Sequence, residues 1–482
     1  MNNPWTLAAL ALSCLVVITT LVSVFGLPRQ NGRPMPLSNY LLADNSLDSK
    51  SIINLLLSGS FGLNALFYAA FLGYSIGLWS LIIQIAWSAS FFLLAPYVGS
   101  IQRFRSLHEF LGERFGPSTR IIAALCSVGG LIYFVTWEIA ISRATLNGLG
   151  IDNQLPRSEL LILGMILGTL IYTTVGGLGG NARANLIQNI LKTVVFGFLT
   201  FLLVERLVKT GVSVRAAMFP PAASIANTLG LIGFATNIMF NLLWQFVDSS
   251  SWQSFIGGSA AREAELAKSL RSSGVTIFVI PNLLATLLGI ALIGTEGIDS
   301  NNILVKSLSL LPSVGPLLLF FVFVAVVASV MSLIDGCFLA SSYALIIDVL
   351  HPNETLASLD KNPQRARRLL ITIRVILVVL ALAATWGVKY LLDIGNIDLF
   401  GLVYVVIIFQ VALIGPVLIS LLTTRRAIFP VSVAIVLSLA IGFGSSITGT
   451  IVGIKWLNDG AGVFAILTSC LFTVLFTRQS TT

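Results

Sequence analysis

The sequence has 482 residues, of which 56% are hydrophobic and only 10% are charged, and its mean hydropathy is +0.94. Soluble proteins carry about 25% charged residues, so this composition is typical of an integral membrane protein and excludes a soluble kinase, nucleotide-binding module or zinc enzyme. The net charge of +8 indicates cytoplasmic loops and contact with anionic lipid. Because no basic run is interleaved with aromatic residues, we expect no nucleic-acid binding.

Apolar runs that are long enough to cross a bilayer recur along the whole chain. A hydrocarbon core about 30 Å thick needs roughly 20 helical residues, so we predict a single all-α polytopic domain with about 13 spans. The predicted spans are 4–26, 51–75, 77–97, 119–147, 158–177, 184–206, 227–255, 272–294, 313–348, 367–391, 395–423, 427–449 and 460–477.

The basic residues of the predicted loops indicate the orientation. The segments predicted to be cytoplasmic hold 18 Lys and Arg residues, including Arg29 and Arg33, and the outer segments hold 7. Excess Lys and Arg mark cytoplasmic loops, so we expect the N-terminus outside and the C-terminus in the cytoplasm.

Three of the predicted spans carry polar or glycine-rich interruptions. These are residues 58–62 in the second span, 244–253 in the seventh and 328–336 in the ninth. Such interruptions in corresponding positions of two halves predict a transport site near the bilayer midplane. The alternative for the glycines of the second span is close helix packing.

Four stretches of the chain resemble the sodium/solute symporter family, which includes bacterial proline and sugar symporters. They are residues 58–77, 106–116, 172–188 and the ninth span through Asp348. The Tyr-Thr-x-x-Gly-Gly-Leu element at 172–178, followed by Gln188, is the most specific of them.

The resemblance implies the five-plus-five inverted-repeat fold of the leucine transporter in the inner (plasma) membrane of a bacterium. One extra helix (4–26) would precede the first repeat (51–206). The second repeat (227–423) would be followed by two C-terminal helices (427–477).

The resemblance also implies a sodium site between the second and ninth spans. Backbone carbonyls at Ser58 and Phe61 would bind the ion, together with the Ser332 hydroxyl and a further contact at Ser329.

Two positions depart from the family pattern at this site. Leu333 stands where relatives supply a second hydroxyl, and Asn185 stands where they usually have an aspartate. A hard cation needs oxygen ligands, so the proton is an alternative coupling ion.

The same resemblance predicts a substrate pocket at the polar block of the seventh span. Asp248 would pair with an amino group of the solute or carry a coupling proton. The predicted substrate-binding residues are Ser60, Trp244, Gln245, Asp248, Ser249 and Ser250.

Four further charged residues lie within predicted spans. Glu138 and Arg143 are five positions apart, which does not suit pairing along one helix, so we expect separate partners or a structural ion pair. Asp335 would compensate for the missing carboxylate at Asn185 or face the cytoplasmic vestibule. Lys192 would pair with a carboxylate or reach the cytoplasmic interface.

Together these residues predict a secondary active transporter that moves a small polar organic solute, such as an amino acid or a related metabolite. Coupling would be to sodium or protons, by alternating access. The alternative function is a transporter-like solute sensor or regulatory subunit that signals to a partner protein. We expect no enzyme activity, because the sequence has no metal cluster and no nucleophile–base set.

Overall fold

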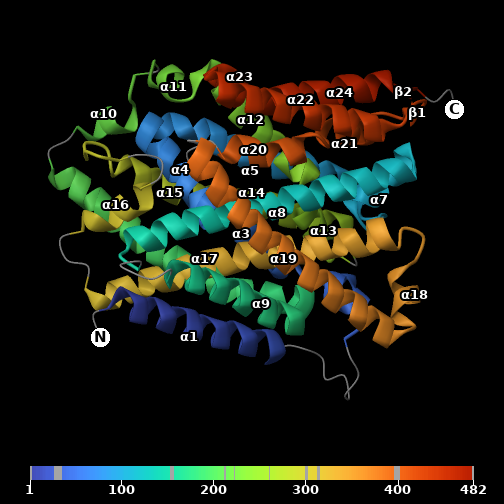
Figure 1. Ribbon diagram of the computed structural model, residues 1–482, viewed down its shortest axis with the longest axis horizontal. Coiled ribbons are helices and arrows are strands. Elements are labelled where there is room, and N and C mark those ends of the chain that lie inside the picture. Colours follow the sequence, from blue (N-terminus) through green and yellow to red (C-terminus); the bar gives the residue numbers. More distant parts are fainter. Residues whose placement is uncertain are drawn as a thin grey trace.

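The computed structural model describes residues 3–25, 35–151, 157–210, 213–221, 223–259, 261–298, 302–311, 315–395 and 402–479. These residues form helices throughout, with one pair of two-residue strands (Figure 1). Arg29 and Arg33, which entered the orientation argument, lie outside the described residues.

The helices fall into long membrane-length segments and short connecting turns. In the first half of the chain they are α1 (Pro4–Phe25), α2 (Leu37–Leu42), η1 (Ala43–Asn45), α3 (Ser49–Gly59), α4 (Leu63–Ile76), η2 (Gly77–Ser80), α5 (Leu81–Leu94), η3 (Ala95–Tyr97), α6 (Val98–Ile101), α7 (Leu107–Phe115), α8 (Pro117–Gly148) and α9 (Arg157–Lys209). In the second half they are α10 (Val214–Met218), α11 (Ala223–Thr228), α12 (Gly230–Val247), α13 (Ser249–Ile256), α14 (Glu263–Ile277), η4 (Phe278–Leu283), α15 (Leu284–Ile290), α16 (Ile303–Ser309), α17 (Pro316–Tyr343), η5 (Ala344–Leu350), α18 (Leu356–Asp360), α19 (Pro363–Gly395), α20 (Leu402–Val411), α21 (Ile414–Leu422), α22 (Val431–Val452), α23 (Lys455–Asp459) and α24 (Ala461–Leu475).

Nine helical segments of the described residues are long and apolar enough to cross a membrane. The protein is therefore a multi-pass integral membrane protein. The 53 residues of α9 would extend about 80 Å if they were straight, far more than one bilayer core. This helix is divided at Gly177 (φ 55°), where a Cβ would lie 2.6 Å from the Tyr40 carbonyl oxygen.

The segment Leu63–Ile101 is likewise divided, at Gly77 (φ 59°). Two shorter apolar helical segments, Ile407–Leu422 and Ala461–Leu475, complete a set that is consistent with the 13 predicted spans. The connection expected between the predicted spans 158–177 and 184–206 is a single break at Gly177, because one glycine with positive φ is enough to end a helix.

The predicted interruptions are present in the second and seventh spans. Residues 60–62 separate α3 from α4, and Asp248 separates α12 from α13. The interruption expected at 328–336 in the ninth span is wrong, because α17 is continuous there. Ser329 Oγ donates a hydrogen bond to the Ala325 carbonyl (2.9 Å), so this hydroxyl lies against its own helix.

The helices pack side by side around a common apolar core (Figure 1). Helix α1 lies along one side of the molecule against α9 and α17, and α22 packs with α24 on the opposite side. Between these sides, α4 contacts α15 and α5 contacts α12. The two broken helices, α3/α4 and α12/α13, therefore lie in the interior of the bundle.

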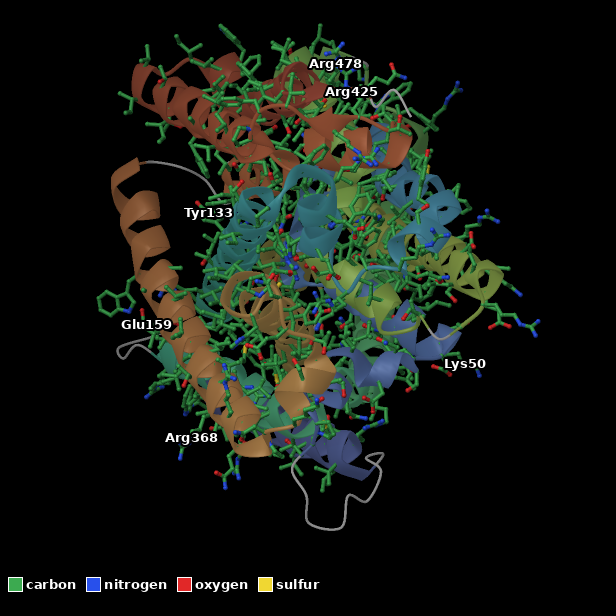
Figure 2. All side chains as sticks on the ribbon, turned by 90° about the vertical axis from the view of Figure 1, so that its right-hand side faces the viewer. Lys50, Tyr133, Glu159, Arg368, Arg425 and Arg478 are labelled. Atoms are coloured by element: carbon green, nitrogen blue, oxygen red, sulfur yellow. The ribbon has the colours of Figure 1, made fainter. Side chains whose placement is uncertain are left out.

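One end of the bundle is held by the strand pair and by a buried charge cluster. Strand β1 (Arg426–Ala427) pairs antiparallel with β2 (Thr477–Arg478), and Arg425 donates a hydrogen bond to the Thr477 carbonyl (2.8 Å). Figure 2, which views this end, shows Arg425 and Arg478 close together.

The buried charge cluster is centred on Asp348, whose side chain is fully buried. It accepts hydrogen bonds from Ser106 Oγ (2.8 Å) and Arg120 Nε (2.9 Å), and His108 Nδ1 lies 2.8 Å from its second oxygen. These contacts join α7, α8 and η5.

Candidate functional site

The break between α3 and α4 is too crowded for any residue larger than glycine at position 62. A Cβ there would lie 2.5 Å from Leu333 Cδ1, 2.7 Å from Asn64 Oδ1 and 3.0 Å from Glu138 Oε2. The absence of a side chain at Gly62 therefore lets α8 and α17 approach the exposed backbone of the break.

Glu138 of α8 caps the second half of this broken helix. Its two carboxylate oxygens accept hydrogen bonds from the backbone N–H groups of Leu63 and Asn64, both at 2.8 Å. These N–H groups have no partner within their own helix, and the helix dipole places partial positive charge there. A buried carboxylate thus occupies the N-terminus of α4.

Asp248 has the same role at the N-terminus of α13. Its carboxylate accepts hydrogen bonds from the backbone N–H groups of Ser250 (3.1 Å) and Ser251 (3.3 Å) and from the hydroxyls of both serines. Both half-helix N-termini in the bundle interior are therefore occupied by carboxylates of the protein itself.

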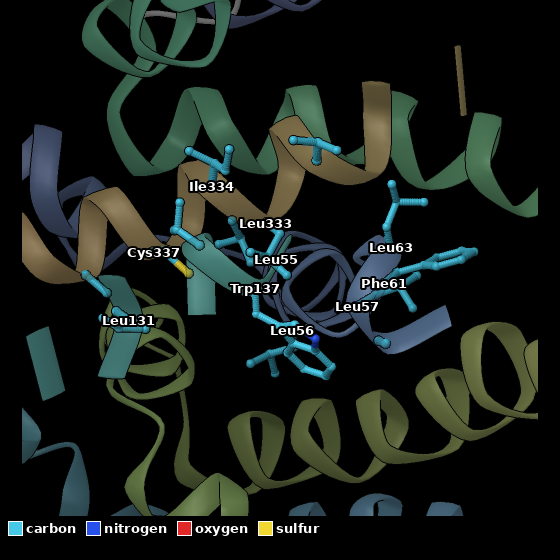
Figure 3. Close-up of a cluster of buried hydrophobic side chains, with 14 of the residues drawn as sticks. Leu55, Leu56, Leu57, Phe61, Leu63, Leu131, Trp137, Leu333, Ile334 and Cys337 are labelled. Carbon is cyan, nitrogen blue, oxygen red and sulfur yellow. The ribbon is translucent and has the colours of Figure 1, made fainter. Parts of the chain in front are cut away.

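Two cavities lie beside these breaks. The first, the acidic chamber, has an empty volume of about 640 Å³, which includes open solvent, and its lining contains Ser60, Asn185, Asp248 and Asp335. Leu55 of α3 and Leu333 and Cys337 of α17 form part of its apolar wall, and Figure 3 shows them gathered in one cluster.

The second cavity, the aromatic chamber, has an empty volume of about 410 Å³ and an apolar lining. Its lining residues are Asn64, Ala65, Tyr68, Trp87, Phe134, Trp137, Phe240, Asn241, Trp244, Val403 and Ile407. Phe134 and Trp244 line both chambers, and their ring centroids are 5.8 Å apart. This aromatic pair forms a shared wall between the two cavities.

Three buried polar atoms of the aromatic chamber have no hydrogen-bond partner within the described part of the chain: Asn64 Nδ2, Trp87 Nε1 and Asn241 Oδ1. The other side-chain atoms of these two amides are engaged, because Asn64 Oδ1 accepts from the Ala65 N–H and Asn241 Nδ2 donates to Tyr68 Oη. Unpaired buried polar atoms are costly, but these three are themselves covered, and the surface that lines the cavity is apolar.

The four residues predicted to hold sodium lie together at the α3/α4 break and α17. The Ser58 carbonyl accepts a hydrogen bond from the Phe61 N–H (3.2 Å). The Phe61 carbonyl and Ser332 Oγ both accept hydrogen bonds from Lys192 Nζ, at 3.1 and 2.9 Å. A cationic group of the protein thus contacts two of the predicted ligands.

Lys192 neither pairs with a carboxylate of the described residues nor reaches the cytoplasmic interface, the two possibilities that the sequence suggested. It is fully buried, and within the described part of the chain no carboxylate lies within ion-pair distance of its ammonium group. Asp335 is also fully buried, and its Oδ2 accepts a hydrogen bond from Tyr172 Oη (2.8 Å). Arg143 pairs with Glu159 (3.2 Å), so Glu138 and Arg143 have separate partners.

Of the six residues predicted to bind substrate, Ser60, Trp244, Asp248 and Ser250 line the acidic chamber, whereas Gln245 and Ser249 do not. The sequence interpretation missed Asn64, Trp87 and Asn241 of the aromatic chamber. Each is a polar or amphipathic residue in a predicted span, and that signal could have singled them out.

No family model matches the chain, and a search of curated protein sequences finds no match. Solved structures do match. A Na+-coupled sialic acid symporter in its substrate-bound outward-open state is 16% identical, with a TM-score of 0.71 over 98% of this chain and 99% of that chain. Mhp1, a nucleobase-cation-symport-1 family transporter, is 13% identical, with a TM-score of 0.55 over 92% and 94%. MhsT, in complex with L-phenylalanine, is 13% identical, with a TM-score of 0.51 over 88% and 97%.

The chain has the fold of these transporters. It is an all-α polytopic membrane protein of the leucine-transporter type, as the resemblance implied.

Proposed function

We propose that this protein is a secondary active transporter that moves a small polar organic solute by alternating access. The observation that carries the proposal is the pair of chambers that meet at Phe134 and Trp244, beside the breaks in α3/α4 and α12/α13. A carrier of this kind needs a solute site that is separated from one side of the membrane by a closed barrier. Displacement of the aromatic pair would join the two chambers.

The solute binds in the aromatic chamber. No charged side chain among the described residues lines that chamber, and three of its lining residues carry a covered, unpaired polar atom, in two cases an N–H donor and in one a carbonyl acceptor. Aromatic walls with a few placed polar groups suit a neutral solute that has an apolar or ring face and both accepts and donates hydrogen bonds. A solute carboxylate would find both half-helix N-termini already occupied, by Glu138 and Asp248.

From the aromatic chamber the solute passes to the acidic chamber, where the predicted residues Ser60, Asp248 and Ser250 contact it before release. Residues 51–206 and 227–423 form the two repeats, with the N-terminus outside and the C-terminus in the cytoplasm. An ion gradient drives uptake, and sodium and the proton are the two ions that the sequence leaves open.

Uptake by proteoliposomes tests this function. The vesicles are incubated with a defined mixture of amino acids, amines, sugars, polyols and nucleobases, and their contents are measured by mass spectrometry under imposed sodium and pH gradients. We expect accumulation of one or a few neutral members of the mixture. No accumulation, or binding without accumulation as in a solute sensor, would contradict the proposal.

A matched pair of tryptophan variants locates the site. Trp87→Phe removes the unpaired indole N–H and keeps an aromatic ring, so uptake at limiting solute should fall about three- to tenfold. Trp456→Phe makes the same change at an exposed position on α23 and should leave uptake unchanged. Equal effects of the two substitutions would place the solute outside the aromatic chamber.

A further inference from the structure

Lys192 holds a cationic group at the centre of the bundle. It lies on α9, its side chain is fully buried, and its Nζ is 4.8 Å from the centroid of the Phe61 ring. The ammonium group donates hydrogen bonds to the Phe61 carbonyl (3.1 Å) and to Ser332 Oγ (2.9 Å). A backbone carbonyl at a helix break, a hydroxyl on the facing helix and an aromatic face therefore surround one positive charge.

We propose that Lys192 takes the place of a bound sodium ion, so that this site carries its cation as part of the chain and does not bind sodium. The inference deepens the proposed function, because it concerns the ion site of the same transporter. A sodium ion between Phe61 and Ser332 would compete with the ammonium group for the same two oxygens. Since the lysine is covalently held, it has no entropy of association to lose.

The neighbouring residues fit a tethered ammonium group better than a free metal ion. The Leu333 side chain has no oxygen, and its Cδ1 lies only 2.5 Å from the position that a Cβ on Gly62 would take, so an alkyl group packs against the break. Asn185 offers a neutral amide and no carboxylate. A site with no side-chain oxygen at 333 and no negative charge at 185 is weak for a hard cation, which requires oxygen ligands.

Ser332 is oriented for this role. Its Oγ donates a hydrogen bond to the Ser329 carbonyl (3.1 Å) and accepts one from Lys192, so the hydroxyl proton points away from the ammonium group. The Ser332 lone pair thus faces the cation.

Two carboxylates balance the charge from a distance. Glu138 on α8 and Asp335 on α17 both act electrostatically on Lys192. Neither carboxylate lies within ion-pair distance of the ammonium group. Both oxygens of Glu138 cap α4 and Asp335 Oδ2 accepts from Tyr172, whereas Asp335 Oδ1 has no hydrogen-bond partner within the described part of the chain. The ammonium group is therefore left to the Phe61 carbonyl and Ser332, where a coupling ion would otherwise bind.

Binding of radioactive sodium to the purified full-length protein tests the inference. The measured quantity is the bound radioactive sodium that unlabelled NaCl displaces and KCl does not. It is compared between the wild type and Ser332→Ala. We expect no difference, because Ser332 already serves Lys192. A saturable component that the wild type has and Ser332→Ala lacks would overturn the inference.

A second set of variants asks whether removal of the lysine opens the site. Lys192→Ala combined with Asn185→Asp and Leu333→Ser restores the oxygen ligands of the family pattern and should gain at least tenfold in sodium affinity. The control is Lys209→Met on the same helix, whose side chain is 72% exposed and pairs with Glu205, and it should not change sodium binding. A folded triple variant without any gain would also overturn the inference.

These measurements need no transport. Sodium binding lost in Ser332→Ala would refute the replacement by Lys192 and leave the transport function standing. Failure of the vesicles to accumulate any solute would refute the transport function and leave the binding result unchanged.

Discussion

Replacing Glu138 with alanine should destabilise the protein far more than removing an ordinary surface carboxylate. The carboxylate of Glu138 accepts hydrogen bonds from two buried backbone N–H groups, those of Leu63 and Asn64, at 2.8 Å each. A buried donor that loses its partner costs about 1–3 kcal/mol, so the two together should cost about 2–6 kcal/mol. Glu138→Gln keeps one acceptor oxygen and should fall between alanine and the wild type.

The assay is reversible unfolding of the purified protein in mixed detergent micelles, followed by circular dichroism. Glu159→Ala is the matched control, because Glu159 is also paired, with Arg143, but its side chain is 45% exposed. Exposed ion pairs contribute about 0–1 kcal/mol, so this control should lose little. A loss in Glu138→Ala no larger than in Glu159→Ala would refute the assignment of Glu138 as the cap of α4.

Three further predictions follow from the same contacts. Asp348→Asn breaks a buried ion pair with Arg120 and should lower the free energy of unfolding by about 3–5 kcal/mol, and a loss below 1 kcal/mol in chemical denaturation would contradict this. Asp248→Ala removes the cap of α13 and should cost about 0.5–2 kcal/mol in the same assay, whereas an unchanged midpoint would show that the cap is dispensable. Gly336→Leu places a side chain in open space within the acidic chamber and should abolish vesicle uptake without lowering the melting temperature. The control Gly444→Leu, at an exposed position, should change neither uptake nor melting temperature, and full uptake by Gly336→Leu would exclude this chamber from the path of the solute.

The architecture was predictable from the sequence because it depends on local patterns. Apolar runs of membrane length predicted the spans, and the glycines and hydroxyls at 58–62 predicted the break between α3 and α4. The same reasoning was wrong for 328–336. There the serines bond back to carbonyls of their own helix, so polar residues alone did not unwind α17.

The contacts of the site were not predictable, because they join residues that are distant in the sequence. Lys192 is separated from Phe61 by 131 positions in the sequence and from Ser332 by 140, and Glu138 is separated from Leu63 by 75, yet each pair is hydrogen-bonded. A single sequence indicates that each charged residue is costly in the membrane but does not indicate which partner offsets that cost.

The tethered ammonium group of Lys192 has a consequence for the response to membrane voltage. After a sodium-coupled carrier releases its ion, the empty form has one positive charge fewer than the loaded form. The membrane potential therefore acts differently on the two forms. Here the lysine remains in the chain whether or not solute is bound. The loaded and empty forms therefore carry the same charge at this site, and the potential acts on uptake only through an ion that binds elsewhere or through a proton that the lysine exchanges.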